Sequence, residues 1–249
     1  MNQNVGTLKK LIQSSERIVI FTGAGISTES GIPDFRSPNG IWSKMRPIEF
    51  RDFVYSAEAR RESWRRKIVI DRDISQALPN RGHRAVAALV RLGFCQTVIT
   101  QNIDGLHQVS GLSDDKIVEL HGNGTYASCL TCGRRHELEP IYIAFARDES
   151  LPVCEQCGGL VKTATISFGQ SMPAEPMRRA YSATINCDLF IVLGSSLVVY
   201  PAAGFPAQAK DHGAKLVIVN RDSTPQDALS DLVLHSEIGL TIGEAVDVN

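Results

Sequence analysis

Two short cysteine pairs carry the clearest chemistry in the sequence. Cys129 and Cys132 form one C-x-x-C-G unit, and Cys154 and Cys157 form a second. A two-residue gap lets one tight turn direct two thiolates at a tetrahedral ion, and the following glycine relieves the strain of that turn. Four sulfurs close the coordination shell and leave no position open for a substrate. The pattern therefore predicts one structural zinc ion, with free or redox-active cysteines as the alternative.

A glycine-rich turn near the N-terminus suggests nucleotide chemistry. Gly23 and Gly25 follow the apolar run 17–21 after one residue, Thr22, which is the order in which a dinucleotide-binding turn begins. Thr28 stands where the third glycine or alanine of that motif would be, and Pro33 would interrupt the long helix that normally follows. These residues predict a phosphate-binding turn without its usual helix, or else a tight turn that binds no ligand.

Polar side chains follow several other apolar runs. Segments 101–107, 194–196 and 220–222 each begin where such a run ends, and His121 follows the run 116–120. Ligands of open α/β sheets bind at the carboxyl ends of the strands, so these segments predict one shared crevice. An imidazole titrates near neutral pH and can act there as a general base, although a histidine at a strand end can also be structural or solvated.

Apolar runs and helical patterns alternate along the chain and predict an α/β fold with a doubly wound parallel sheet. The runs are short, β-branched and continuous, as expected for strands that are covered on both faces. The expected strands are 17–21, 97–100, 189–193 and 216–219, with 116–120 and 232–234 as weaker candidates, and helical patterns cover 83–92 and 202–212. Segments 37–81 and 122–165 do not fit this alternation and predict insertions that form a second, smaller domain.

The overall composition limits the expected partners. Among 249 residues, 26 Lys and Arg face 27 Asp and Glu, which leaves a formal net charge of -1. Such a balance argues against nucleic-acid or membrane binding through bulk electrostatics. No apolar run is long enough to span a bilayer, and the first ten residues lack the apolar stretch of a signal peptide. We therefore expect a cytoplasmic protein that binds neither nucleic acid nor membranes.

Taken together, the motifs closely resemble those of the sirtuins, a family of NAD-dependent protein-lysine deacylases. The matching segments occur in the family's order: GAGIS at 23–27, PDFR at 33–36, TQNIDGLH at 100–107, HG at 121–122, the four cysteines, GSS at 194–196 and NRD at 220–222. The resemblance implies a Rossmann-like NAD-binding domain and a small domain built from a helical insertion and a zinc ribbon. The implied boundaries are 1–36, 82–121 and 166–249 for the first domain, and 37–81 with 122–165 for the second.

The resemblance also implies roles for individual residues. His121 would activate a ribose hydroxyl, Asp104 would hold the nicotinamide carboxamide, and Asn102 would orient ribose or water. The products would be nicotinamide, deacylated lysine and O-acyl-ADP-ribose. The implied cofactor-binding residues are Gly23, Ala24, Gly25, Ser27, Thr28, Asp34, Phe35, Arg36, Gln101, Asn102, Ile103, Asp104, His121, Gly194, Ser195, Ser196, Asn220, Arg221 and Asp222. The implied contacts to an acylated-lysine peptide are Ile166, Phe168, Gly169, Gln170 and Val198.

The other histidines are expected to have no catalytic role. His107 ends the TQNIDGLH motif and is expected to be structural. The remaining four suggest only surface or capping roles: His83, His136, His212 and His235.

The chain departs from the sirtuin pattern after the second cysteine pair. Thr163, Ser167 and Gln170 replace a proline, an aromatic residue and a glutamate, and we expect these changes to affect substrate and acyl preference more than cofactor use. Glu62 and Arg65 are the nearest match to the Tyr-x-x-Arg pair of sirtuins that remove succinyl or malonyl groups. Because a glutamate replaces the tyrosine, neutral acyl groups are expected. A protein mono-ADP-ribosyltransferase and a non-catalytic NAD-sensing module remain as alternative functions.

Overall fold

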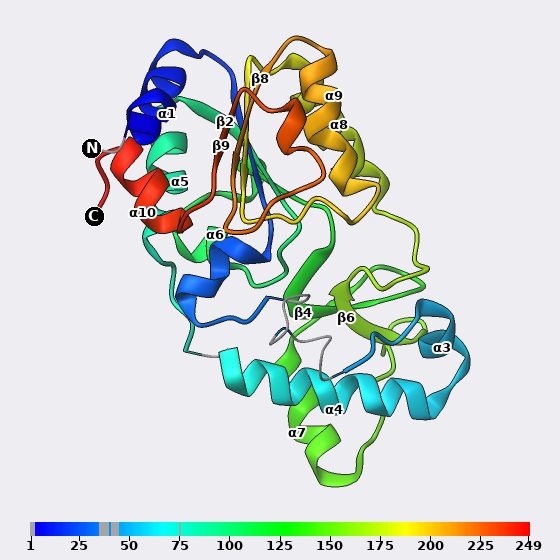
Figure 1. Cartoon of the computed structure of the whole chain (residues 1–249). Coiled ribbons are helices and arrows are strands. Elements are labelled where there is room, and N and C mark those ends of the chain that lie inside the picture. The colour runs from blue at the N-terminus through cyan, green and yellow to red at the C-terminus, as the bar shows by residue number, and fades with distance from the viewer. Residues whose placement is uncertain (1–2, 35–39, 41–44, 75) are drawn as a thin grey trace.

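A six-stranded parallel sheet forms the larger part of the molecule (Figure 1). The computed structural model describes residues 3–34, 40, 45–74 and 76–249. The strand order is β3-β2-β1-β7-β8-β9, so the chain proceeds from β1 to one side and later returns to its other side. This reversal creates the switch point at which open α/β sheets bind ligands. The strands are β1 (Ile18–Thr22), β2 (Cys95–Thr100), β3 (Ile117–Glu119), β7 (Leu189–Leu193), β8 (Lys215–Val219) and β9 (Leu232–Leu234).

All six strands lie on the apolar runs predicted from the sequence, and helices cover both faces of the sheet. Along β1, Ile18 and Ile20 point to one face while Val19 and Phe21 point to the other, and all four are buried. One face carries α1 (Gln3–Ser14), α5 (Arg81–Arg91) and α10 (Ile238–Ala245), and the other carries α8 (Ala174–Asn186) and α9 (Phe205–Asp211). The doubly wound α/β architecture is therefore confirmed.

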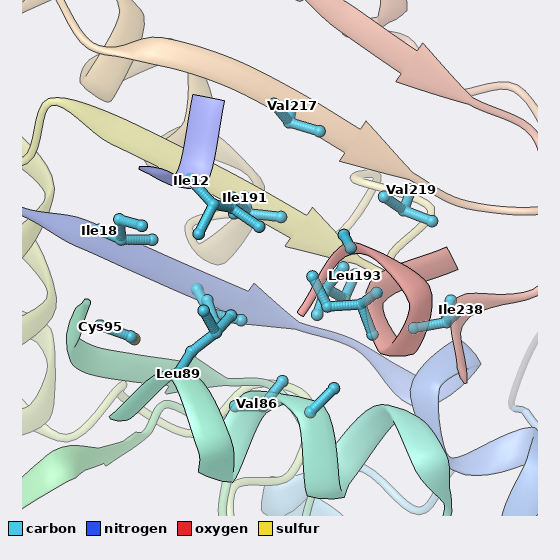
Figure 2. Packing of buried hydrophobic residues seen from close by; sticks show 14 of the residues in the cluster. Ile12, Ile18, Val86, Leu89, Cys95, Ile191, Leu193, Val217, Val219 and Ile238 are labelled. Carbon is cyan, nitrogen blue, oxygen red and sulfur yellow. The ribbon is translucent and has the colours of Figure 1, made fainter. Parts of the chain in front are cut away.

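Helix α5 shows how local sequence positions a helix on the sheet. The Asn80 side chain caps its first turn by accepting hydrogen bonds from the backbone N–H groups of Gly82 and His83. Val86 and Leu89, three residues apart on one helical face, point into the core toward β1 and β7 (Figure 2). The same Asn80 also donates to the carbonyl oxygen of Ile26 at 2.7 Å, so the helix is tied to the glycine-rich turn.

The two insertions meet and form one body beside the sheet, which we call the inserted region (Figure 1). It contains α3 (Phe50–Tyr55), α4 (Ala57–Ile74), α7 (Leu138–Asp148) and a sheet of order β5-β4-β6, with β4 (Gly122–Cys129), β5 (Arg135–His136) and β6 (Val161–Thr165). Trp64 of α4 and Phe145 of α7 belong to one apolar cluster, and the Trp64 ring centroid lies 6.5 Å from that of Tyr142 on α7. The Tyr142 hydroxyl donates to Asp71, which also accepts from Lys67. The exact domain boundaries remain a prediction.

Shorter helices connect these elements. They are η1 (Ala24–Ser30), α6 (Leu106–Val109), η2 (Asp114–Lys116), η3 (Ala202–Gly204) and η4 (Asp227–Leu229). The short 3₁₀ helix η1 directly follows β1, so the long helix of an ordinary dinucleotide-binding motif is absent at this position, as the sequence predicts. Among the described residues, no helix combines the length and apolar character needed to cross a membrane.

Candidate functional site

A cavity of about 720 Å³ lies at the carboxyl ends of the parallel strands and extends to the inserted region. Most of the residues predicted to bind cofactor or substrate line it. They are Ala24, Gly25, Thr28, Asp34, Gln101, Asn102, Ile103, His121, Ile166, Phe168, Gly169, Gln170, Gly194, Ser195, Ser196, Asn220, Arg221 and Asp222. Residues far apart in the sequence thus meet in one crevice, because the ends of parallel strands share one edge of the sheet.

The remaining predicted residues lie beside or behind this lining. Gly23, Ser27 and Asp104 support the cavity wall through hydrogen bonds and packing. Val198 is exposed and adjoins Val199, which does line the cavity. Phe35 and Arg36 lie outside the described residues, so their predicted places near nicotinamide and the phosphates stay predictions.

Sequence reasoning missed the end of the cavity next to α10. Ser236, Glu237 and Ile238 line this part, and they begin two residues after the end of β9. Segment 232–234 was expected as a strand, and the strand-end argument used for the other segments would have pointed to these residues. The missed lining also includes Pro47 and Ile48 of the inserted region, and Met172, which packs against the apolar core of the sheet.

Three glycines allow two strand ends to approach closely beneath the cavity. A Cβ atom on Gly23 would lie 2.6 Å from the carbonyl oxygen of Gly194, and one on Gly25 would lie 2.7 Å from the Gly194 Cα. Gly194 itself has a φ of 69°, and the Gly25 N–H donates to its carbonyl oxygen at 2.8 Å. The glycine pattern that suggested phosphate binding is therefore also required for packing of the turn after β1 against the turn after β7.

Polar side chains hold η1 against the end of β2. Ser27 donates to one oxygen of Asp104 at 2.7 Å, and the Leu106 N–H donates to the other at 2.9 Å. The buried Asn102 amide donates to the Gly23 carbonyl oxygen and to the Ser27 hydroxyl. Asn102 and Asp104 thus position the glycine-rich turn, and their predicted contacts with ribose and nicotinamide remain predictions.

His121 lies at the cavity wall in an orientation that suits a general base. Its Nδ1 is 3.0 Å from the carbonyl oxygen of Gln101, and because a carbonyl can only accept, Nδ1 carries the proton. This tautomer places a lone pair on Nε2. The backbone is held as well, since the Ile166 N–H donates to the His121 carbonyl oxygen at 2.8 Å. Gly122 has a φ of 73°, and a Cβ atom there would lie 2.0 Å from the Ala164 carbonyl oxygen.

Two other histidines are buried behind the cavity, and the prediction for one of them is wrong. The spacing of α5 turns His83 inward, where it is fully buried and its ring centroid lies 5.2 Å from that of His107. His107 Nε2 lies 2.9 Å from the Thr22 hydroxyl, in agreement with the structural role expected for it. Burial lowers the pKa of both imidazoles, so both are neutral near pH 7.

Arg65 lies outside the cavity lining and is engaged by two glutamates. Its guanidinium donates to Glu149 in the zinc-binding insertion at 2.6 and 2.5 Å, and to Glu58 at 2.7 Å. Glu62 accepts from Arg66 at 2.6 Å. Neither Glu62 nor Arg65 belongs to the cavity lining, so the possibility that they face an acyl group is not supported: Arg65 instead joins the two insertions.

The four paired cysteines form a compact cluster of sulfur atoms. The Sγ atoms of Cys129 and Cys157 are 3.5 Å apart, those of Cys132 and Cys154 are 3.7 Å apart, and all four lie within 4.8 Å of one another. Tetrahedral zinc with Zn–S bonds of about 2.3 Å requires sulfur separations of about 3.8 Å, so the cluster fits this ion.

The turns around the cluster agree with a structural metal. Gly133 and Gly158, which follow the two cysteine pairs, have φ values of 73° and 72°, as the C-x-x-C-G pattern predicts. The Thr131 N–H lies 3.4 Å from the Cys129 sulfur, where it stabilises a thiolate. Because all four cysteines lie outside the cavity lining, the metal would act on folding rather than on substrate.

These features place the protein among nucleotide-binding α/β proteins that carry a separate metal module. The model of the Sir2 family matches residues 23–201, and the chain belongs to this family. It is 54% identical over 246 residues to an NAD-dependent protein deacetylase of Rhodopseudomonas palustris, covering 99% of this chain and 97% of the relative. An NAD-dependent protein deacetylase 1 of Bradyrhizobium diazoefficiens is also 54% identical over 246 residues, with coverages of 99% and 96%. A solved Sir2–p53 peptide–NAD⁺ structure matches with a TM-score of 0.86 and 36% identity, covering 97% of this chain and 96% of the other.

Proposed function

We propose that the protein is an NAD-dependent protein-lysine deacylase that yields nicotinamide, O-acyl-ADP-ribose and deacylated lysine. The observation that carries the proposal is the orientation of His121, whose Nδ1 faces the Gln101 carbonyl oxygen while its ring borders the cavity at the switch point. Family membership supports the same activity, since the similar proteins are named as NAD-dependent protein deacetylases.

The cavity offers suitable groups for NAD. The turn at Gly23 to Gly25 offers close backbone approach at the switch point, and Asn220 and Asp222 offer polar groups at the end of β8. When bound, NAD would supply an ADP-ribosyl group to which the acyl group moves as nicotinamide leaves. The Nε2 atom of His121 would accept the proton of a ribose hydroxyl, and the Gln101 carbonyl oxygen would hold the required tautomer.

The cavity also favours neutral acyl groups. Its lining includes the apolar side chains of Ile48, Ile103, Phe168 and Met172. An unpaired carboxylate is costly against such a wall, and Arg65 is engaged by Glu149 and Glu58 instead. We therefore infer a preference for acetyl-lysine and other uncharged acyl-lysines, and assign the contacts with the peptide to the segment 165–170 and to Val198.

Reduced zinc thiolates and a nucleotide co-substrate fit action in the cytoplasm on acylated proteins. The proposal involves no nucleic acid or membrane partner. It is consistent with the near balance of 26 basic and 27 acidic residues.

Mass spectrometry of NAD incubated with the protein and an acetylated peptide tests the proposal. The expected products are nicotinamide, O-acetyl-ADP-ribose and the deacetylated peptide. A protein or peptide mass increased by ADP-ribose would instead indicate the transferase alternative, and unchanged NAD would favour a sensing module. Comparing kcat/KM for acetyl-, butyryl-, myristoyl- and succinyl-lysine on one peptide tests the acyl preference, which succinyl-lysine as the best substrate would contradict.

A further inference from the structure

Lys162 is a buried cation directly behind one wall of the cavity. Only 4% of the residue is exposed, and its ammonium group donates to the carbonyl oxygens of Thr165 at 2.5 Å and Thr163 at 3.3 Å. Among the described residues, no carboxylate lies within 4.0 Å of Nζ to form an ion pair. Burial lowers the pKa of Lys162 to about 8, so most of the side chain is still protonated at pH 7.

Lys162 lies on β6, and the pairing of β6 with β4 is irregular where these contacts form. Gly122 of β4 pairs with Thr165 of β6, but the next pair of the ladder joins Ala127 to Thr163. Additional residues of β4 therefore bulge out opposite this end of β6. Backbone carbonyls near such a break lack the regular geometry of a ladder, and a buried ammonium that donates to two of them limits how the end of the strand can bend.

The residues that follow this contact form what we call the cleft wall, segment 165–170, every residue of which lines the cavity. Its first part is tied to the general base, because the Ile166 N–H donates to the His121 carbonyl oxygen at 2.8 Å. Its far part is tied to α3, because the Phe50 N–H donates to the Phe168 carbonyl oxygen at 2.8 Å. The position of the cleft wall relative to His121 therefore depends on the contacts that hold the two parts of this segment.

Lys162 interacts with both elements that hold the cleft wall, the end of β6 and helix α3. Its Nζ holds the Thr165 carbonyl oxygen, and it lies 6.0 Å from the ring centroid of Phe53, which is buried on α3 three residues after Phe50. A cation at this distance from an aromatic ring is attracted to its face. One buried ammonium thus links the end of β6 to the helix that contacts the other end of the cleft wall.

We propose that Lys162 is a positioning residue that sets the cleft wall for the acylated peptide. The proposal rests on the deacylase function proposed above, because it concerns how that site receives its peptide. Lys162 acts from behind the wall, through the Thr165 carbonyl oxygen and Phe53, and does not contact NAD or the acyl group. Its loss should therefore impair binding of the peptide more than binding of NAD.

Steady-state kinetics of Lys162→Met tests this role. Methionine keeps the length and apolar stem but removes the donor, so the hydrogen bond to the Thr165 carbonyl oxygen is lost. We expect the KM for an acetylated peptide to rise about tenfold or more, the scale of a lost charge-assisted hydrogen bond, while the KM for NAD changes less than about twofold. Lys162→Arg retains a charged donor and should bring the peptide KM back toward that of the wild type.

Lys67→Met provides a matched control within the same region. Lys67 is also a largely buried lysine, but it pairs with Asp71 on α4 and lies outside the cavity lining. This control should lower the melting temperature without changing either KM. An equal rise of the peptide KM in both variants would indicate general loosening of the inserted region and would overturn the proposal.

Two further results keep the role of Lys162 separate from the proposed function. Wild-type protein that does not deacetylate the peptide would refute the deacylase function itself, whereas active wild type with an unchanged peptide KM in Lys162→Met would refute only the positioning role. If Lys162→Met fails to retain zinc or to fold, Lys162→Gln is the deciding variant. Its neutral donor falls about one bond short of the Thr165 carbonyl oxygen. The folded Gln variant should show a raised peptide KM and an unchanged KM for NAD, and a wild-type peptide KM would overturn the proposal.

Discussion

The parallel sheet and the inserted region are stabilised by different means. The sheet buries apolar side chains on both faces, against helices on either side. The inserted region has a much smaller apolar cluster, two of whose members, Cys129 and Cys154, belong to the four-thiolate site. A region with so little apolar burial needs additional links, which here are a metal site and polar contacts from α4 to Tyr142 of α7 and to Glu149 directly after α7.

The cavity lies where the sheet and the inserted region meet, so each region contributes different residues to its lining. The glycine-rich turn and the ends of β2, β7 and β8 come from the sheet, whereas His121 and the cleft wall adjoin the inserted region. We therefore expect changes in the inserted region to affect the use of the acylated peptide first. Changes in the sheet should affect global stability or NAD binding.

Replacing Cys129 by alanine should have the largest effect. Three thiolates bind zinc much more weakly than four, so zinc should be lost and the inserted region should unfold while the sheet remains folded. Metal analysis together with thermal unfolding measures this change, and deacylation should be abolished. Cys95→Ala is the matched control, because Cys95 is buried in the sheet and should leave the zinc content unchanged. Full zinc content and an unchanged melting curve in Cys129→Ala would contradict the metal site.

His121→Ala should separate chemistry from stability. We expect kcat/KM for acetyl-lysine peptide to fall at least about a hundredfold, the usual contribution of a positioned general base. NAD binding, zinc content and the melting temperature should remain close to those of the wild type. The exposed His212, replaced by alanine, serves as the control and should retain full activity. Near-normal turnover of His121→Ala would remove this residue from the mechanism.

Acid should destabilise the packing of the helices against the sheet, because His83 of α5 and His107 of α6 are buried there. Burial lowers the pKa of His83 and His107 in the folded protein, whereas both would titrate near 6.5 in an unfolded chain. The unfolded state therefore binds more protons below about pH 6.5, and the stability present above that pH is lost as the pH falls toward the lowered values. Urea unfolding at pH 7 and 5.5 should show a loss of about 1 kcal/mol per imidazole.

The variant His83→Leu tests the origin of this acid sensitivity. Neither ring nitrogen of His83 has a hydrogen-bond partner in the described part of the chain, so an apolar side chain can replace it without leaving a partner unsatisfied. The variant should lose less stability between pH 7 and 5.5 than the wild type. An identical loss in both proteins would assign the effect to other groups.

Arg65→Ala should have the smallest effect. Its ion pairs with Glu149 and Glu58 join the two insertions, but the Arg65 and Glu149 side chains are 38% and 43% exposed, and such pairs contribute little. We expect the melting temperature to fall by no more than about 2 °C and the ratio of acetyl to succinyl activity to stay unchanged. A marked shift of that ratio would mean that Arg65 reaches the acyl group.

Local patterns predicted the parts of the molecule whose geometry depends on neighbours in sequence. Each predicted strand was a continuous apolar run, and each run became a strand of the parallel sheet because its side chains are buried on both faces. The C-x-x-C-G pairs predicted glycines in tight turns, and Gly133 and Gly158 have the positive φ values that this requires. The rule that ligands bind at the carboxyl ends of parallel strands predicted one shared crevice, and Gln101, His121 and Ser195 do line one cavity.

Contacts between segments that are distant in the sequence could not be predicted from local patterns. The sequence indicated that Gly23 and Gly25 form a turn, but only the folded chain shows that they pack against Gly194. Likewise, the pattern near Arg65 suggested an acyl contact, whereas α7 places Glu149 beside it and engages the guanidinium there.

The sequence by itself determined the sheet, the four zinc ligands and the strand ends that line the cavity, because these depend on side-chain type and short spacing. Tertiary structure decided which polar groups are buried and what they contact. His83 lies on a helix whose periodicity permits an inward position, but its place beside His107 depends on the packing of α5 against α6. Lys162 is a buried cation where β6 pairs irregularly with β4, 6.0 Å from the ring centroid of Phe53, and no local pattern encodes that meeting of three separate segments.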